Sequence, residues 1–417
     1  MRLGWGVDGD TWRLRIGLHP EDTLAGIGQD GRDIQLVTDG CRIELPESAG
    51  EPHPDLRALS AWLVAQPWAK RRVVFDLPVS PAFAEAVGRG WAVEVGPVDP
   101  ELAPRAAGTV AGLSYSGGLD SVAVSAMLPP GSAHVHLRRV PHPRVPNRRG
   151  LAEVAAAERL VRAAGERDRD VLVVRTDLEF LTLPFPMLPT WPAFAVGLVL
   201  LADRRRLGAA AFGTVLESRF LRNGVKFSTA GASPWAEPFA VAGVPMLRPA
   251  AGMTEVLTMR VAGTSGLGDL ARSCFAGESQ LPCLACAKCL RKELLNAAAR
   301  RGRLPTRLRR RLPESHPVAR RLLDREPPYY FQDMLEYALA RVDVSGHWLD
   351  RLRDRLRPTV AGTAWAEHYY PLALDLEVPA AWRPAAERYA RERIGLMTPA
   401  EVETVRTWDA ATRIAGS

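Results

Sequence analysis

Lysine is scarce in this chain, although the chain as a whole is basic. Its 417 residues carry a net charge of +7, yet only four of the 54 basic residues are lysine. Arginine, alanine and proline are abundant along the whole sequence, which is typical of a GC-rich genome. We therefore interpret the positive charge as compositional bias, and nucleic acid is not the partner that we expect.

Long apolar runs are also missing. No stretch approaches the 18 or so apolar residues that a membrane-spanning helix needs. The best candidate, residues 194–202, is short and runs into Asp203 and three arginines, so it predicts a buried helix of the core. Residues 1–5 lack the charged and apolar regions of a secretion signal. These absences predict a cytoplasmic protein without a membrane partner.

Cysteine is rare as well, but four of the five cysteines lie close together. Cys41 stands alone, whereas Cys274, Cys283, Cys286 and Cys289 follow the spacing C-x8-C-x2-C-x2-C. A disulfide framework is not expected in a cytosolic chain of this length. Four thiolates at this spacing are typical of a closed tetrahedral site, which is structural rather than catalytic. The sequence predicts bound Zn²⁺ and favours it over an iron–sulfur cluster.

The chain is long enough for two or three domains. Short strand and helix patterns over residues 1–105 predict a small α/β domain, and the prolines of residues 97–104 predict a linker after it. Residues 106–300 form the second expected domain and residues 301–417 a helical C-terminal region. In the second domain, apolar strands over 110–115, 133–137, 171–174 and 209–213 alternate with helices over 121–128, 151–164 and 191–207. This alternation predicts an α/β fold whose parallel sheet has helices on both faces.

A glycine turn comes directly after the first of these apolar strands, in the string Leu-Ser-Tyr-Ser-Gly-Gly-Leu-Asp-Ser of residues 113–121. A strand that enters a helix through two glycines directs several backbone N–H groups at one point, which favours an anion. Ser116 and Ser121 can add hydroxyl donors, and Asp120 can hold Mg²⁺ or cap the helix. The Walker motif G-x-x-x-x-G-K-[ST] is absent.

The Ser-Gly-Gly-Leu-Asp-Ser string resembles the signature of the PP-loop ATP pyrophosphatases. The resemblance implies an adenine nucleotide alpha hydrolase-like fold, ATP and Mg²⁺ as ligands, and attack on the α-phosphate to form an adenylate. It implies catalytic roles for Asp120 and Ser121. The nucleotide would contact Ser114, Tyr115, Ser116, Gly117, Gly118, Leu119, Asp120, Ser121, Asp177 and Gly213.

Together with the cysteine spacing, the loop is similar to 7-cyano-7-deazaguanine synthase-like proteins over roughly residues 109–296. That family converts a carboxylate to a nitrile with ATP and ammonia. The resemblance thus implies adenylation of a small-molecule carboxylate or amide oxygen with release of pyrophosphate, and then attack of ammonia or an amine. Met253 stands where the family usually has a lysine, and residues 213–218 also depart from it, so we expect a different acceptor.

Two other functions remain open at this stage. The same loop and the basic helical tail would also suit an enzyme that adenylates RNA for thiolation, although Cys41 is the only spare cysteine. Alternatively, the chain is a nucleotide-dependent module that conjugates or senses a protein partner, for instance in a defence system. A homodimer is a further possibility.

Several other polar residues have an ordinary structural interpretation. Asp177 comes after the third apolar strand, where it suits a ligand site or a helix cap equally well, and residues 217–219 come after the fourth strand in the same way. His134 and His136 alternate with apolar residues and are expected to pack in the core. The arginine run over residues 300–311 is expected to be a solvated face rather than an RNA contact.

Overall fold

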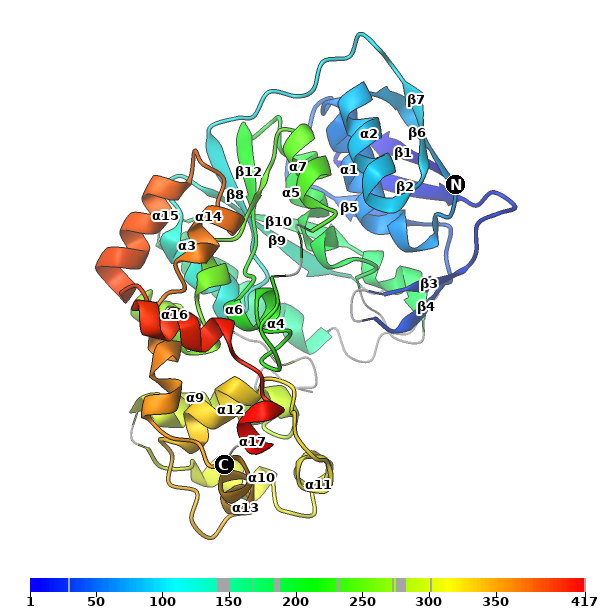
Figure 1. The fold of residues 1–417 in the computed structure, drawn as a ribbon. Helices are drawn as coiled ribbons and strands as arrows, with labels where there is room; N and C mark the ends of the chain where they lie inside the picture. The colour runs from blue at the N-terminus through cyan, green and yellow to red at the C-terminus, as the bar shows by residue number, and fades with distance from the viewer. Residues whose placement is uncertain are drawn as a thin grey trace. The chain divides into compact units, whose positions relative to one another are not determined.

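The computed structural model of the chain describes residues 1–28, 31–140, 151–167, 169–183, 188–229, 231, 233–271, 274, 283–300 and 302–415. The chain divides into two compact units, which are described separately (Figure 1). The first contains Met1–Ser116, Leu128–Phe212 and Ala232–Leu247. The second contains Gly117–Met127, Gly213–Gly231 and Arg248–Ser417.

A ten-stranded sheet forms the centre of the first unit, in the order β13-β12-β8-β9-β10-β5-β2-β1-β6-β7. In chain order the strands are β1 (Arg2–Asp8), β2 (Thr11–Gly17), β5 (Gly40–Glu44), β6 (Arg72–Val79), β7 (Glu94–Val98), β8 (Val110–Ser114), β9 (Ala133–Arg139), β10 (Asp170–Thr176), β12 (Leu207–Ala211) and β13 (Met246–Leu247). The strands β3 (Ala25–Ile27), β4 (Asp33–Leu36) and β11 (Thr182–Leu183) form a small second sheet.

The half of the large sheet from β13 to β10 is parallel throughout. Strands β8 and β12 contain few polar residues, and all five residues of β12 are buried, as expected for strands that are covered on both faces. Strand β8 comes first in the chain among these parallel strands, and the later ones lie on both sides of it, β9 and β10 on one side and β12 and β13 on the other. The chain thus leaves β8 toward one edge of the sheet and later returns to add β12 on the other side of β8. The carboxyl ends of the neighbouring strands β8 and β12 therefore form a topological switch point.

The N-terminal strands continue this sheet instead of forming a sheet of their own. Strand β5 pairs antiparallel with β10, where Glu44 lies opposite Arg175 and Ile43 opposite Thr176. Strands β2 and β1 are the next antiparallel neighbours, and β6 and β7 then add parallel to β1. The two compact units thus differ from the three segments expected from the sequence: residues 1–105 share one hydrophobic core with the parallel strands.

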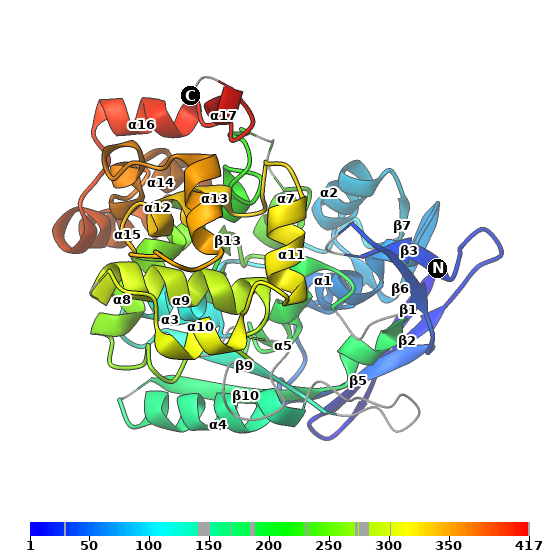
Figure 2. The same ribbon diagram turned by 90° about the horizontal axis from the view of Figure 1, so that it is seen from below.

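Helices cover both faces of this sheet. They are α1 (Pro54–Ala65), α2 (Pro81–Trp91), α4 (Leu151–Gly165), α5 (Val196–Leu200) and α7 (Ala236–Val241), with 3₁₀ turns η1 (Gln66–Trp68), η2 (Leu178–Leu181) and η3 (Trp191–Ala195). Helix α4 packs on β9 and β10 on one side of the sheet (Figure 2). On the other side α5 packs on β8 and β9, and its neighbour α1 packs on β1 and β6. In a right-handed crossover, the direction in which the chain moves along the sheet decides which face its helix covers. The chain moves one way from β9 to β10 and the other way from β10 to β12, so α4 and α5 cover opposite faces.

The second unit is helical. It consists of α3 (Leu119–Met127), α6 (Leu216–Arg219), η4 (Pro249–Gly252), α8 (Glu255–Thr264), α9 (Ala287–Arg300), α10 (Thr306–Arg311), α11 (Pro317–Asp324), α12 (Gln332–Leu339), α13 (Leu349–Leu356), η5 (Ala361–Glu367), α14 (Leu372–Glu377), α15 (Arg383–Tyr389), η6 (Ala390–Ile394), α16 (Pro399–Arg406) and α17 (Thr412–Ala415). Helix α3 packs against α8, and α12 packs against α9. Caps fix several helix starts: the Thr254 hydroxyl accepts from the N–H of Leu257 at 3.3 Å at the start of α8.

The structure therefore confirms an α/β fold with a large, mostly parallel sheet, flanking helices and a helical C-terminal region. Residues 195–202 are buried as expected, but the helix expected over 191–207 is wrong in extent. Its first turn is 3₁₀, α5 ends at Leu200, and Arg206 has a φ of +51°, which turns the chain directly into β12. Among the described residues, no helix is long and apolar enough to span a bilayer.

Candidate functional site

The glycine turn lies where the sequence placed it, between β8 and α3. Gly117 has a φ of +78°, a left-handed conformation that favours glycine. The Ser121 hydroxyl donates to the carbonyl of Gly118 at 2.9 Å, and the N–H of Val122 donates to the same carbonyl at 3.1 Å. The turn is thus bent tightly into the first turn of α3. It comes after the carboxyl end of β8, the strand at which the sheet order reverses.

Gly213 approaches the start of α3 closely. A Cβ atom on Gly213 would lie 2.9 Å from the backbone nitrogen of Ser121 and 3.1 Å from the carbonyl carbon of Asp120. A carbon atom does not fit 2.9 Å from a backbone nitrogen, and 3.1 Å is a tight contact, so a side chain at this position would force the start of α3 to shift. The structure therefore brings together Gly213, Asp120 and Ser121, three of the residues that the sequence assigned to one site.

Asp120 is held by partners that sequence reasoning missed. Its Oδ1 atom accepts a hydrogen bond from the Thr258 hydroxyl at 2.8 Å. The Nζ atom of Lys292 lies 3.8 Å from the same oxygen and 3.2 Å from Oε1 of Glu255. Lys292 stands only three residues after the last cysteine of the motif. The one feature of the sequence that could have drawn attention to Lys292 is that lysine is rare in this chain and that Lys292 lies close to the cysteines.

Glu255 is the centre of a buried ionic cluster. Its side chain accepts two hydrogen bonds from Arg291, from Nε at 2.6 Å and from Nη2 at 2.9 Å. Burial raises the pKa of Glu255, but the charges of Lys292 and Arg291 outweigh burial and lower it to about 2. Glu255 is therefore a carboxylate that balances the two cations of α9.

Two further acids lie close to Glu255 and differ from it in charge. Glu217 is fully buried, and its Oε1 atom accepts from the N–H of Glu255 at 2.8 Å. Burial raises the pKa of Glu217 well above its ordinary value, and the neighbouring Asp333 and Glu255 add to this effect. Burial also raises the pKa of Asp333, to about 7. Burial thus disfavours the charged form of both groups, and the hydrogen bond from the N–H of Glu255 ties the Glu217 side chain to the start of α8.

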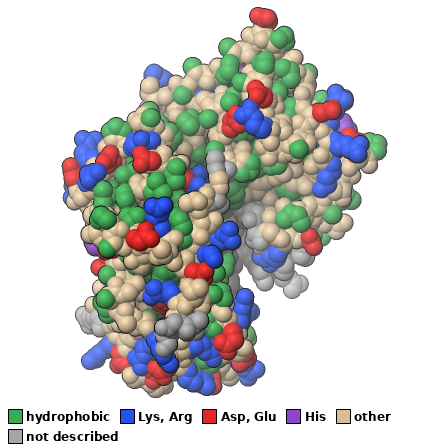
Figure 3. Space-filling model, viewed as in Figure 1, with side chains coloured by type: hydrophobic (Ala, Val, Ile, Leu, Met, Phe, Trp, Pro, Cys, Tyr) green, Lys and Arg blue, Asp and Glu red, His purple; other side chains and the backbone are tan. Residues whose placement is uncertain are grey.

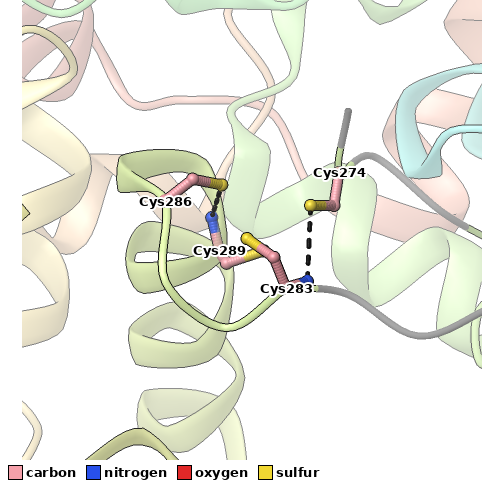
Figure 4. Close-up of side chains that lie close together, drawn as sticks. All are labelled: Cys274, Cys283, Cys286 and Cys289. Atoms are coloured by element: carbon pink, nitrogen blue, oxygen red, sulfur yellow. Dashed lines mark hydrogen bonds between the residues drawn. The ribbon is translucent and has the colours of Figure 1, made fainter. Parts of the chain in front are cut away.

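The four clustered cysteines converge in space (Figure 4). Their Sγ atoms all lie within 4.8 Å of one another, and those of Cys283 and Cys289 are 3.7 Å apart. A tetrahedral metal with bonds of about 2.3 Å to sulfur requires about 3.8 Å between sulfurs, so the cluster fits such an ion. Backbone N–H groups donate to sulfur, from Cys289 to Cys286 Sγ at 3.4 Å and from Cys283 to Cys274 Sγ at 3.5 Å. These donors favour the thiolate form that binds metal.

A pocket of about 390 Å³ lies beside the cysteine cluster within the second unit. Its lining includes Leu119 in the first turn of α3, Met259 and Gly263 of α8, and Cys274 and Cys289. Helix α9 supplies most of the polar lining, from Lys288, Lys292, Glu293, Asn296 and Arg300, and Arg307 and Asp269 complete it. The first turn of α3 and the cysteine cluster therefore border the same cavity.

The remaining predicted nucleotide contacts belong to the first unit. Ser114 is the last residue of β8, and the buried ring of Tyr115 stacks edge-on against His134 at 5.5 Å. Ser116 is exposed at the start of the turn. Asp177 accepts from the backbone N–H of Arg42 at 2.7 Å through its carboxylate, so it helps to fasten β5 to β10.

The structural interpretations of the histidines and arginines agree with the structure. His134 and His136 are buried, and each ring hydrogen-bonds a backbone carbonyl, of Ser132 at 3.0 Å and of Tyr115 at 2.8 Å. Burial lowers the pKa of His134 to about 4. Arg307 pairs with Glu293 at 2.7 Å. In Figure 3, basic and acidic side chains are interspersed over the visible face instead of forming one basic patch.

Comparison with known proteins gives one partial match. Residues 234–409 match the model of a family of unknown function, DUF6395. The match includes the cysteine cluster and helices α8 and α9, and it begins after the glycine turn. No curated protein and no solved structure matches the chain.

Proposed function

We propose that this chain is an ATP-dependent adenylating enzyme that activates a carboxylate or amide oxygen and passes the acyl group to ammonia or an amine. The observation that carries this proposal is the turn at Gly117 and Gly118. It links a central parallel strand to a helix at the point where the strand order reverses, and Asp120 and Gly213 converge on its first helical turn. Such turns expose backbone N–H groups to anions at the carboxyl edge of a sheet.

The proposed chemistry begins with ATP seated by its phosphates on the N–H groups of the turn, with the Ser116 and Ser121 hydroxyls beside it. An acceptor oxygen attacks the α-phosphorus, the bond from this phosphorus to the bridging oxygen breaks, and pyrophosphate leaves with the bonding electrons. Hydrogen bonds from the turn stabilise the charge that develops on pyrophosphate. Mg²⁺, which a carboxylate such as Asp120 can help to hold, would neutralise part of the phosphate charge.

The second half of the reaction transfers the acyl group. Nitrogen of ammonia or an amine adds to the acyl carbon and loses a proton, and AMP leaves with the oxygen that it had activated. A carboxylate acceptor gives an amide in this way. When the oxygen of a primary amide is adenylated in a second round, the nitrogen loses both of its protons, one on adenylation and one as AMP leaves, and a nitrile results.

We further propose that the four cysteines bind Zn²⁺ as a structural ion. Four sulfur ligands complete a tetrahedral zinc and leave no position for substrate. The fit of the sulfur positions supports this occupancy. In the proposed reaction zinc fixes the first turn of α9 and takes no part in bond making.

Cys41 weighs against the alternative of RNA thiolation. Sulfur transfer by a persulfide needs a reactive, accessible thiol. Cys41 is only 6% exposed, and burial, together with the charge of Asp177, raises its pKa well above the ordinary value. The other four cysteines occupy the metal-binding cluster.

The turn can be tested with a matched pair of glycine substitutions. Gly117 and Gly346 both belong to the second unit and have φ of +78° and +69°, but only Gly117 lies in the turn. Each change to alanine adds comparable backbone strain, roughly 1–2 kcal/mol. We expect Gly117→Ala to lower the rate of AMP formation about 100-fold, because its Cβ displaces backbone donors from the phosphates. Gly346→Ala retains the rate.

The assay measures AMP and pyrophosphate by ³¹P NMR, with ATP, Mg²⁺, ammonia and a panel of carboxylates, and product mass gives the acceptor. Formation of ADP and orthophosphate in place of AMP and pyrophosphate would reject the proposed chemistry. Equal loss of activity in both glycine variants would show that strain, and not the turn, limits the reaction.

A further inference from the structure

Two of the four lysines lie on one face of α9, at the pocket beside the cysteine cluster. Lys288 and Lys292 are four residues apart, so their side chains project from successive turns of the helix, and both line the pocket of about 390 Å³. Lys288 stands between two clustered cysteines, Cys286 and Cys289. A metal held by these cysteines would therefore fix the turn of α9 that carries Lys288.

The charge of the pocket suits an anion. Four cationic side chains line it, those of Lys288, Lys292, Arg300 and Arg307, against two acidic ones, Asp269 and Glu293. Arg307 is already paired with Glu293 at 2.7 Å. Two lysines of like charge on successive helical turns repel each other weakly, and an anion beside them would reduce this repulsion. Asp120 and Glu255 already lie near the Lys292 ammonium, and an anion in the pocket would add negative charge beside both lysines.

The pocket also adjoins the proposed nucleotide turn. Its lining includes Leu119, the residue directly after Gly118. Lys292 Nζ lies 3.8 Å from Asp120 Oδ1, and the Lys292 side chain is only 12% exposed. The Thr258 hydroxyl holds Asp120 in place at 2.8 Å. A phosphate group at the first turn of α3 would therefore meet the helix N–H groups and a buried lysine ammonium together.

We propose that this pocket is a pyrophosphate site in which Lys288 and Lys292 bind the leaving group of the adenylation reaction. The inference deepens the proposed function and rests on it. Lys288 and Lys292 take the role that a lysine inside the loop has in a Walker motif, and they reach the turn from a helix more than 160 residues later in the chain. The cysteine cluster then has a second consequence, because it positions the residues that hold the anion.

Inorganic pyrophosphate with Mg²⁺ is the probe, and its affinity is measured by titration calorimetry. We expect Lys288→Met and Lys292→Met to weaken binding about 10- to 100-fold each, the loss of one charged hydrogen bond. Lys288→Arg and Lys292→Arg should recover part of the affinity. Lys226→Met is the matched control: Lys226 belongs to the same unit, is 57% exposed and pairs with Asp409 at 2.7 Å, so affinity should change less than about twofold.

Zinc content and melting temperature are measured for every variant, so that loss of the fold is separated from loss of the anion site. If Lys288→Met and Lys292→Met bind pyrophosphate as tightly as the unaltered protein, the proposed pyrophosphate site is rejected, and formation of AMP would still support the proposed adenylation. If the unaltered protein binds pyrophosphate through these lysines but forms no AMP, the pyrophosphate site is supported and the proposed adenylation is rejected.

The scarcity of lysine provides a second measurement on the unaltered protein, which does not depend on variants that fold. The chain is acetylated with and without saturating pyrophosphate, and the extent of modification at each of the four lysines is read by peptide mass spectrometry. We expect pyrophosphate to slow modification of Lys288 and Lys292 and to leave Lys70 and Lys226 unchanged. Equal modification of all four lysines in both conditions overturns the proposal.

Discussion

Three acids within one buried cluster differ in the charge that their surroundings impose. Glu255 accepts two hydrogen bonds from Arg291 and lies 3.2 Å from Lys292, so it is ionised. Asp333 is fully buried, and its Oδ1 atom accepts from the backbone N–H of Met334 at 2.8 Å. The pKa of Asp333 nevertheless rises to about 7, chiefly through burial, and the charge of Glu255 adds to it. Its ionisation must therefore cost folding energy.

Asp333→Asn should make the protein more stable at alkaline pH. The pKa is raised in the folded state relative to about 3.9 in the unfolded chain, so the stability that Asp333 provides is full below about pH 4 and is lost as pH rises to about 7. Asparagine keeps an acceptor for Met334 and has no charge to bury. We expect a gain of roughly 1–4 kcal/mol at pH 8 and almost none at pH 4, measured by urea unfolding.

Asp324→Asn is the matched control, since Asp324 is an aspartate at the end of α11 in the same unit, outside the buried cluster. It should not produce the gain at pH 8 that Asp333→Asn produces. A gain from Asp333→Asn that is equal at pH 4 and pH 8 would mean that asparagine improves local packing, and that Asp333 carries no cost of ionisation.

At the scale of secondary structure, α9 connects the features of the candidate site. One face carries Lys288 and Lys292 toward the pocket beside the cysteines, and Arg291 joins the helix to Glu255 of α8. A separate cavity of about 290 Å³ is lined by Ala287, Leu290 and Arg291, together with residues of α11 and α12. The position of this helix therefore affects both cavities, and its first turn carries Cys289 of the cysteine cluster.

Removing one cysteine ligand should loosen α9 before it affects the sheet. We expect Cys286→Ser to lower bound zinc from about one equivalent to nearly none and to speed hydrogen exchange over residues 283–300. Exchange in β8 and β12 should be unchanged. Zinc analysis and exchange mass spectrometry measure these effects, and a strong chelator should reproduce them. Cys41→Ala is the control, because Cys41 lies in β5 and is expected to leave zinc content intact. Full zinc content in Cys286→Ser would exclude the four-cysteine site.

At the scale of the molecule, local sequence patterns predicted elements better than they predicted how those elements join. The apolar strands β8, β9, β10 and β12 and the glycine turn are signals within a few residues, and all were found. Strand β13 has two residues and β7 contains Pro97, so neither gives a periodic pattern. The pairing of β5 with β10 joins residues more than 130 positions apart, and periodicity carries no information on such a contact.

In the candidate site too, local motifs could be predicted from the sequence, whereas contacts between distant residues could not. The turn and the four cysteines were predictable, because each is a continuous motif in which the chemistry requires particular residue types. Thr258 was not predictable, since its contact with Asp120 spans 138 positions and threonine is common at helix surfaces. Lys292 was overlooked for a similar reason: its role depends on α8, α9 and α3 meeting in space.

The continuous sheet makes a prediction about cutting the chain between its expected domains. Residues 99–101 connect β7 to the segment before β8 and are accessible, whereas Arg105 is fixed by Asp203 at 2.5 Å and by carbonyls of Leu207 and Gly243. We expect a protease site inserted after Asp99 to be cut without separation of the fragments, because β5 remains paired with β10 and both fragments share one core. Gel filtration should show co-elution in buffer and separation in urea. Fragments that separate in buffer would mean that residues 1–105 form an independent domain, as the proline-rich linker alone suggested, and that the β5–β10 pairing contributes little to the stability of the sheet.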